Sequence, residues 1–143
     1  MANNEAILRE VYRRFSAGDA EYLYTTLSDN VVWSSSGNRD IIPFAGEWRG
    51  VSGVREFLTT SRRDWDVQKH EPLEFFSAGN DTRFAVRVAI EAVNLQTKGR
   101  VRLEKVDLVT MEGGKVTSYS EIFDSALTER AVGVGPFERP MEL

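Results

Sequence analysis

The sequence predicts an α+β roll in which helices come first and an antiparallel sheet follows. Two stretches before residue 62 carry apolar residues at helical spacing, and the chain then alternates as strands do. Four strands are expected here, at about residues 65–76, 82–94, 100–110 and 115–124. The turn signals AGND, TKG and EGG lie between them, and such short connections make neighbouring strands antiparallel. This order of elements is typical of α+β proteins.

The first helix is predicted from five apolar residues at helical spacing: Ile7, Leu8, Val11, Tyr12 and Phe15. Asn3 or Asn4 can cap its start, and Gly18 ends it. Asp19 can cap a second short helical segment.

A turn is predicted at residues 28–30 and a strand over residues 31–35. Residues 36–50 are expected to form a long loop with unusual apolar content, and such loops often cover binding sites. Ser52 is the expected N-cap of a helix that ends near Ser61.

The length of 143 residues suits one domain with a real core. We expect this domain to span residues 1–131 and an irregular tail to span residues 132–143. The segment ALTERAV predicts one or two helical turns, and the glycines and prolines of GVGPFERPMEL prevent a regular element after it.

Composition favours small molecules as ligands. The net charge of −4 argues against nucleic acid, whose binding needs a concentrated basic surface. There is no cysteine, and His70 is the only histidine, so no metal site is expected and His70 is predicted at the surface or an interface. The first 15 residues lack an uninterrupted apolar run, so neither a signal peptide nor a membrane anchor is expected and the predicted location is the cytoplasm.

The strand at residues 115–124 places a carboxylate between two aromatic rings. Tyr119, Glu121 and Phe123 share one face, because successive strand side chains point to opposite sides. A glutamate in this position lies either on a wet surface or in an apolar place that raises its pKa, which suits acid or base chemistry near neutral pH.

Four segments in this order resemble the SnoaL-like family of the nuclear transport factor two-like (NTF2-like) superfamily: the first helix with its GD, LSDNVVWSSSG, PFAGEWRGVSGVREFL and EGGKVTSYSEIFD. The resemblance covers residues 5–131. It implies a cone-shaped roll, with N-terminal helices packed on a curved, mostly antiparallel sheet around an internal pocket.

Three enzyme branches of this superfamily imply different site residues. Ketosteroid isomerases would place their catalytic base at Ser35, their second aspartate at Val106 and their helix tyrosine at Val11, so that mechanism is not expected. Limonene epoxide hydrolases resemble the last strand, where their cavity aspartate corresponds to Glu121, but their water-positioning pair corresponds to Trp33 and Ser35. The SnoaL-type polyketide cyclases imply a second candidate acid or base, Asp124, at the end of the last strand.

On this fold, Glu121 is the expected catalytic acid or base and Tyr119 a hydrogen-bond donor. The other residues expected to line the pocket are Tyr12, Trp33, Ser35, Phe44, Trp48, Phe57, Arg102, Glu104, Val106 and Phe123. Burial is expected to raise the pKa of Glu121. The alternatives are a pairing with Arg102 that keeps Glu121 ionised, or a satisfied polar network of Arg102, Glu104 and Glu121 with no chemistry.

Two functions stay open at this point. One is a cofactor-independent isomerase, cyclase or hydrolase that acts on a small, largely apolar molecule. The other is a binding or association domain without catalysis. The resemblance also implies a homodimer through the sheet face, with Val101, Leu103 and Val109 as its expected apolar contacts.

Overall fold

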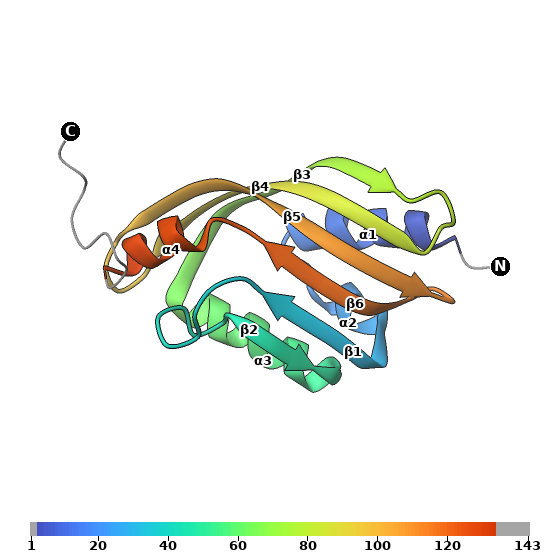
Figure 1. Cartoon of the computed structure of the whole chain (residues 1–143), viewed down its shortest axis with the longest axis horizontal. Helices are drawn as coiled ribbons and strands as arrows, with labels where there is room; N and C mark the ends of the chain where they lie inside the picture. Colours follow the sequence, from blue (N-terminus) through green and yellow to red (C-terminus); the bar gives the residue numbers. More distant parts are fainter. Residues whose placement is uncertain (1–2, 134–143) are drawn as a thin grey trace.

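A computed structural model describes residues 3–133, which form an α+β fold with a six-stranded, curved and unclosed mixed sheet (Figure 1). The helices are α1 (Asn4–Ser16), α2 (Glu21–Thr25), α3 (Gly50–Asp64) and α4 (Ser125–Val132). The strands are β1 (Leu27–Ser35), β2 (Gly46–Arg49), β3 (Trp65–Ser77), β4 (Arg83–Asn94), β5 (Arg100–Glu112) and β6 (Lys115–Ile122). Their order in the sheet is β2-β1-β6-β5-β4-β3, and only β1 and β6 run parallel.

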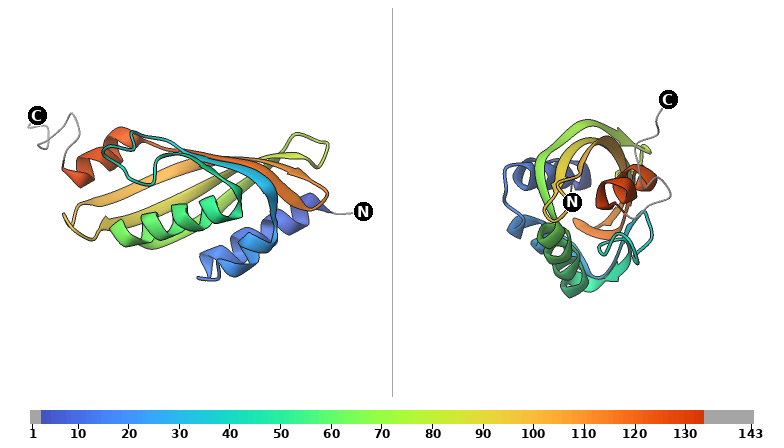
Figure 2. Two further views of the ribbon diagram at one scale, coloured as in Figure 1. Left: turned by 90° about the horizontal axis from the view of Figure 1, so that it is seen from below. Right: turned by 90° about the vertical axis from the view of Figure 1, so that its left-hand side faces the viewer.

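The sheet bends around its concave side, and helices close that side. Figure 2 shows α1 and α3 along the concave side, with α4 at one end of the molecule. The core lies between them, and its fully buried side chains include Val31, Val54, Val86, Val88 and Met111. This arrangement leaves an enclosed space between the helices and β3 to β6.

Two parts of the chain hold the start of α1. The side chain of Asn3 accepts a hydrogen bond from the backbone N–H of Ala6, as the sequence predicted. The Asp81 carboxylate, from the loop between β3 and β4, accepts the N–H groups of Asn4 and Glu5 at 2.9 and 3.0 Å. These contacts fix α1 against the far end of the sheet, and α1 carries Tyr12 toward the enclosed space.

Three local predictions are wrong. Residues 28–30 belong to β1, which begins at Leu27, and they lie in a bulge between Leu27, which is opposite Val116 of β6, and Val32, which is opposite Ser118. The expected loop of residues 36–50 contains an edge strand, β2, which pairs with β1. Helix α3 begins at Gly50 and has Arg49 as its N-cap, so Ser52 lies inside the helix.

A bulge between β5 and β6 sets the register of the hairpin. At its closed end, Glu112 lies opposite Lys115 and Met111 opposite Val116. Thr117 is then an extra residue on β6, because Thr110 lies opposite Ser118. One extra residue turns every later side chain of one strand to the other face relative to its partner. Consequently Asp107, rather than Val106, lies opposite Glu121.

The predicted tail falls mostly outside the described part of the chain. The helical turns expected from ALTERAV are present as α4, whose start is capped by the Asp124 side chain. The rest of the predicted tail, residues 134–143, lies outside the described residues. No helix within residues 3–133 is long and apolar enough to cross a membrane.

Candidate functional site

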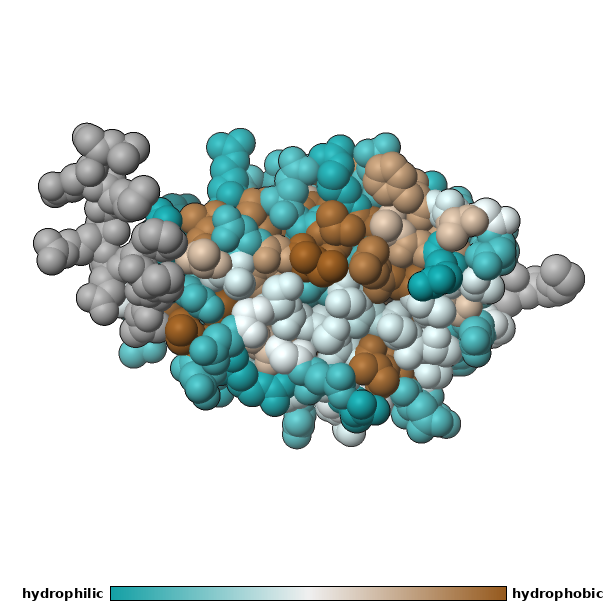
Figure 3. Space-filling view, in the orientation of Figure 1, coloured by the Kyte–Doolittle hydropathy of each residue, from teal (hydrophilic) through white to brown (hydrophobic). Residues whose placement is uncertain are grey.

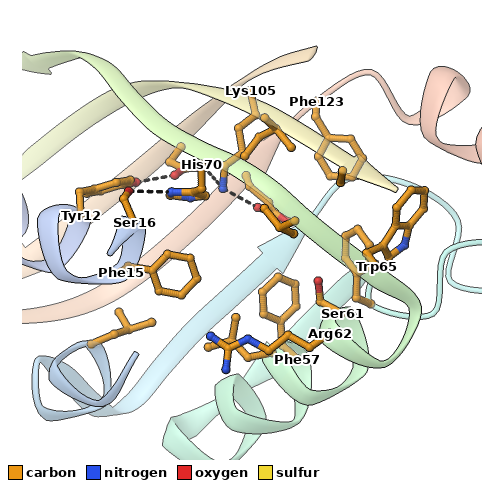
Figure 4. A pocket seen from close by; sticks show the side chains of 18 of the residues that line it. Tyr12, Phe15, Ser16, Phe57, Ser61, Arg62, Trp65, His70, Lys105 and Phe123 are labelled. Atoms are coloured by element: carbon orange, nitrogen blue, oxygen red, sulfur yellow. Dashed lines mark hydrogen bonds and ion pairs between the residues drawn. The ribbon is translucent and has the colours of Figure 1, made fainter. Parts of the chain in front are cut away.

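A cavity of about 620 Å³ occupies the concave side of the sheet (Figure 4). Its wall comes from α1, α2, α3, the strands β1 and β3 to β6, and α4. Most of this wall is aliphatic or aromatic, including Leu8, Val11, Phe15, Leu23, Trp33, Phe44, Phe57, Trp65, Val109 and Phe123. A space of this size and character suits a small, largely apolar molecule.

Lys105 is the centre of a buried polar network in this wall. Its Nζ lies 2.8 Å from Glu121 Oε2, 2.9 Å from the Tyr119 hydroxyl and 3.1 Å from Asp107 Oδ1. The first two contacts are hydrogen bonds and the third is an ion pair, so one ammonium balances two buried carboxyl groups.

Glu121 is the carboxylate of the network that reaches the cavity. Ser35 Oγ donates to its Oε1 at 2.5 Å, and Lys105 and the Tyr119 hydroxyl donate to its Oε2. Glu121 remains 7% exposed, whereas Asp107 is 0% exposed. Both carboxyl groups belong to residues of the cavity wall, but only Glu121 keeps exposed surface.

Asp107 lies behind Lys105 and pairs with α1. The Tyr12 hydroxyl donates a short hydrogen bond to Asp107 Oδ2. Burial raises the pKa of the Asp107 carboxyl, and the neighbouring Glu121 raises it further, although Lys105 acts in the opposite direction. The pair resembles the tyrosine and aspartate of ketosteroid isomerases, and each member lies one position after the residue expected for it, Val11 or Val106.

The charges of the network depend on its burial. Burial lowers the pKa of Lys105, but Asp107 and Glu121 outweigh this, so the net effect is a raised pKa and a permanent ammonium at neutral pH. Burial, reinforced by Asp107, raises the pKa of both Tyr12 and Tyr119 well above 10. Both tyrosines are therefore neutral hydrogen-bond donors over the physiological range.

Aromatic rings pack around Tyr119, which contacts the candidate acid or base Glu121. Trp33 stacks on Tyr119 with ring centroids 3.7 Å apart and also contacts Phe57. Phe44 lies against both Phe57 and Phe123. This frame restricts Tyr119, which in turn contacts Glu121 and Lys105.

His70 lies in the cavity wall, so the predicted surface or interface position is wrong. Its Nδ1 is 3.1 Å from Ser16 Oγ, and its ring packs between Tyr12 and Phe15 (Figure 4). Burial, and then the positive charge of Lys105, lowers the pKa of His70 from 6.5 to about 3. The imidazole is therefore neutral at physiological pH.

Most of the predicted pocket residues are on the cavity wall, although their roles stay predictions. Those that line the cavity are Tyr12, Trp33, Phe44, Phe57, Tyr119, Glu121 and Phe123. Ser35 reaches the site through its hydrogen bond to Glu121. Trp48 does not line the cavity, because its indole N–H donates to the Phe44 carbonyl and Arg39 covers its ring.

The expected pocket positions of Arg102, Glu104 and Val106 are wrong. All three side chains are exposed on the outer face of β5, where Glu104 pairs with Arg87 of β4. The Thr117 bulge is the physical reason, because it turns the other row of β5 toward Glu121. The expected pairing of Arg102 with Glu121, and the expected network of these two with Glu104, are therefore replaced by Lys105 and Asp107.

The alternative acid or base, Asp124, is also away from the cavity. Its carboxylate is exposed and accepts the backbone N–H of Leu127 at 3.0 Å. It therefore acts as the N-cap of α4.

The sequence analysis did not identify Lys105 and Asp107 as site residues. One signal was present: both alternate in step with Val101, Leu103 and Val109, a row of apolar residues typical of a core-facing strand. Among the described residues, no group of three or more histidine, aspartate and glutamate side chains could hold a metal ion.

Comparisons with known proteins identify the same fold. The sequence profile of the SnoaL-like domain matches residues 8–119. An NTF2-like protein of unknown function from Burkholderia pseudomallei is 22% identical, with a TM-score of 0.81 over 92% of this chain and 98% of that chain. TerC, crystallised with polyporic acid, is 23% identical, with a TM-score of 0.80 over 92% of this chain and 98% of its own.

A protein from Mesorhizobium loti described as a SnoaL-like polyketide cyclase is 17% identical, with a TM-score of 0.70 over 82% of this chain and 97% of that chain. At these identities the likeness shows the fold alone. No curated protein sequence matches the chain.

Proposed function

The chain belongs to the SnoaL-like domain family, and from this premise we propose that its cavity binds a small, largely apolar molecule and catalyses proton transfer on it without a cofactor. Glu121 is the acid or base of this proposal. The substrate class is a compound with a carbonyl group and an acidic neighbouring C–H, as in an enone or a polyketide-like ester. The reaction class is isomerisation or cyclisation.

The observation that carries the proposal is the buried charged network in a largely apolar cavity. Buried charges are costly unless they are paired, so a surface of this kind is seldom built from lysine and two carboxylates without a use. Lys105 and Glu121 each keep 7% of their surface exposed, whereas Asp107 keeps none. Glu121, Lys105 and Tyr119 therefore face the ligand, and Asp107 is a positioning residue for Lys105.

The proposed step uses these groups in fixed roles. The Glu121 carboxylate takes a proton from the carbon next to the substrate carbonyl, the C–H bond breaks, and its electron pair moves to give an enolate. The Lys105 ammonium and the neutral Tyr119 hydroxyl stabilise the negative oxygen. Glu121 then returns the proton to another carbon, which completes an isomerisation with no net change in protons.

Glu121→Gln tests the catalytic role. We expect the wild-type protein to turn over members of a panel of cyclic enones, epoxides and polyketide-like esters, and the variant to lose at least about 100-fold in kcat, since general base catalysis contributes about 10²–10⁴-fold. Glu104→Gln is the matched control, because Glu104 is an exposed glutamate on the outer face of β5. Full activity in Glu121→Gln would show that the assignment is wrong.

The second function left open is binding without catalysis, and the pairing of Lys105 with two carboxyl groups favours it. Lys105 contacts Glu121, Asp107 and Tyr119 within the protein, as in a purely structural network. Fluorescence of Trp33 and Trp65, which lie in the wall, should report binding of apolar probes. Binding of panel members with no turnover of any of them would favour this function.

We also propose a homodimer through the outer face of the sheet. Val106 and Ile122 lie opposite each other there, next to Leu108, and all three are exposed. Figure 3 shows hydrophobic groups gathered over the middle of this face, between hydrophilic margins. The expected contacts Val101, Leu103 and Val109 line the cavity and cannot take this role.

A second copy fits this patch because its margins carry both signs of charge. Arg87 and Glu104 flank the apolar residues on the same face, so a two-fold axis can bring each charge of one copy near the opposite charge of the other. Sedimentation at about 50 μM should show a dimer that Leu108→Glu dissociates. A wild-type monomer at that concentration would refute the proposal.

A further inference from the structure

Arg62 places an exposed positive charge on the cavity wall. It lies in the last turn of α3, and Figure 4 shows its side chain extending past Phe57 on the helix side of the cavity. Within residues 3–133, its guanidinium has no ion pair, hydrogen bond or ring contact. The neighbouring Arg63, by contrast, makes a bidentate pair with Asp64, at 3.0 and 2.9 Å.

The ammonium of Lys105 in the polar network, in contrast to Arg62, has partners within the protein. Lys105 donates hydrogen bonds to Tyr119 and Glu121 and lies 3.1 Å from Asp107 Oδ1, so its positive charge is already balanced within the protein. Two carboxyl groups surround this one ammonium, and the net charge of the network is therefore zero or negative whether or not Asp107 is protonated. An anionic group on a ligand gains nothing there and is repelled by Glu121.

The remaining charged group of the wall does not neutralise Arg62. Asp66 also lines the cavity, is exposed and accepts a weak hydrogen bond from Gln68 at 3.4 Å, but it forms no ion pair with Arg62. His70 is neutral at physiological pH. Arg62 is thus the cationic group of the described wall whose charge no carboxylate in residues 3–133 balances, and a guanidinium binds a carboxylate through two parallel hydrogen bonds.

We propose that the ligand is an apolar molecule that carries a carboxylate, with the carboxylate bound by Arg62 and the apolar body directed toward Glu121 and the aromatic frame. This inference rests on the proposed function and names the substrate class of the same cavity. It also gives the ligand one orientation, because its negative group is attracted at one end and repelled at the other.

The test compares an acid with its neutral ester. The probes are 2-naphthoate and methyl 2-naphthoate, measured by calorimetric titration against the wild-type protein, Arg62→Gln and the matched control Arg63→Gln. We expect the wild-type protein to bind the acid about five- to tenfold more tightly than the ester, as suits one partly exposed charge-assisted contact. Arg62→Gln should remove this preference and leave ester affinity unchanged, whereas Arg63→Gln should keep the preference.

The outcomes separate this inference from the proposed function. Equal binding of the acid and the ester by the wild-type protein, or an unchanged preference in Arg62→Gln, overturns the role of Arg62 and leaves the apolar cavity as a binding site. If Arg63→Gln loses the preference for the acid as fully as Arg62→Gln does, the role of Arg62 is also overturned, because a general effect of surface charge would then explain the result. Binding of neither probe at 1 mM overturns both proposals.

Discussion

His70 should make the folded protein less stable as the pH falls, by an amount that follows from its position. Burial, and then the charge of Lys105, lowers the pKa of His70 from 6.5 to about 3. The unfolded chain therefore binds a proton below pH 6.5 that the folded chain does not accept until about pH 3. Stability from this group is complete above pH 6.5 and decreases as the pH falls toward 3.

The magnitude is a large fraction of the stability of a small domain. Each pH unit in this window removes about 1.4 kcal/mol from the free energy of unfolding. At pH 5, which is about 1.5 units below the unfolded pKa, the neutral imidazole should cost about 2 kcal/mol. Domains of this size are typically stable by only about 5–15 kcal/mol.

Urea unfolding of the wild-type protein and of His70→Gln, at pH 7.5, 6.0 and 5.0, measures this cost. Glutamine does not titrate, so the difference in free energy of unfolding between the two proteins should change by about 2 kcal/mol from pH 7.5 to pH 5.0, in favour of the variant. Asp107, whose pKa is raised, contributes a slope of opposite sign, but it is present in both proteins and cancels. A difference that stays constant with pH would refute the reasoning, because His70 would then ionise freely in the folded state.

Two further variants test the polar network around Lys105 and the packing of α4 against Gly99. Lys105→Met should lower the free energy of unfolding at pH 7 by about 3–5 kcal/mol, because it leaves Asp107 and Glu121 as buried carboxyl groups without a cation; a loss below about 1 kcal/mol in urea unfolding would contradict this. Gly99→Ala should displace α4, because a Cβ there would lie 2.2 Å from the Ala131 carbonyl oxygen. Faster proteolysis within residues 125–132, with little change in the rest of the chain, is the expected result, and an unchanged cleavage rate would contradict it.

Local patterns were sufficient to predict most elements. The apolar spacing of the first helix, its Asn3 cap and the alternation in β4 depend on residues close in sequence, and the structure contains all three. Tyr119 and Glu121 of β6, and Phe123 just after the strand, all line the cavity as predicted. The edge strand β2 was missed because it has only four residues and is stabilised by pairing with β1 rather than by a pattern of its own.

Which residues of β5 lie in the site depended on the pairing register of β5 and β6, and alternation within one strand does not reveal that register. Alternation divided β5 into two rows, one with Arg102, Glu104 and Val106 and one with Lys105 and Asp107, but either row could face Glu121. The mapping onto the resembled fold placed the row of Arg102, Glu104 and Val106 beside Glu121, which was the wrong choice. A single extra residue at Thr117 decided the matter, because it sets which residues of β5 lie opposite β6.

The sequence by itself therefore determined the α+β class, the order of the elements and the ring-flanked carboxylate of β6, since these follow from short-range periodicity. Only the tertiary structure decided which charges surround that carboxylate. It placed Lys105 and Asp107 beside Glu121, drew His70 into the wall and left Arg62 on the cavity wall with no partner among residues 3–133. The physical reason is that burial and charge pairing arise between strands and helices distant in sequence, through a register that one inserted residue can reverse.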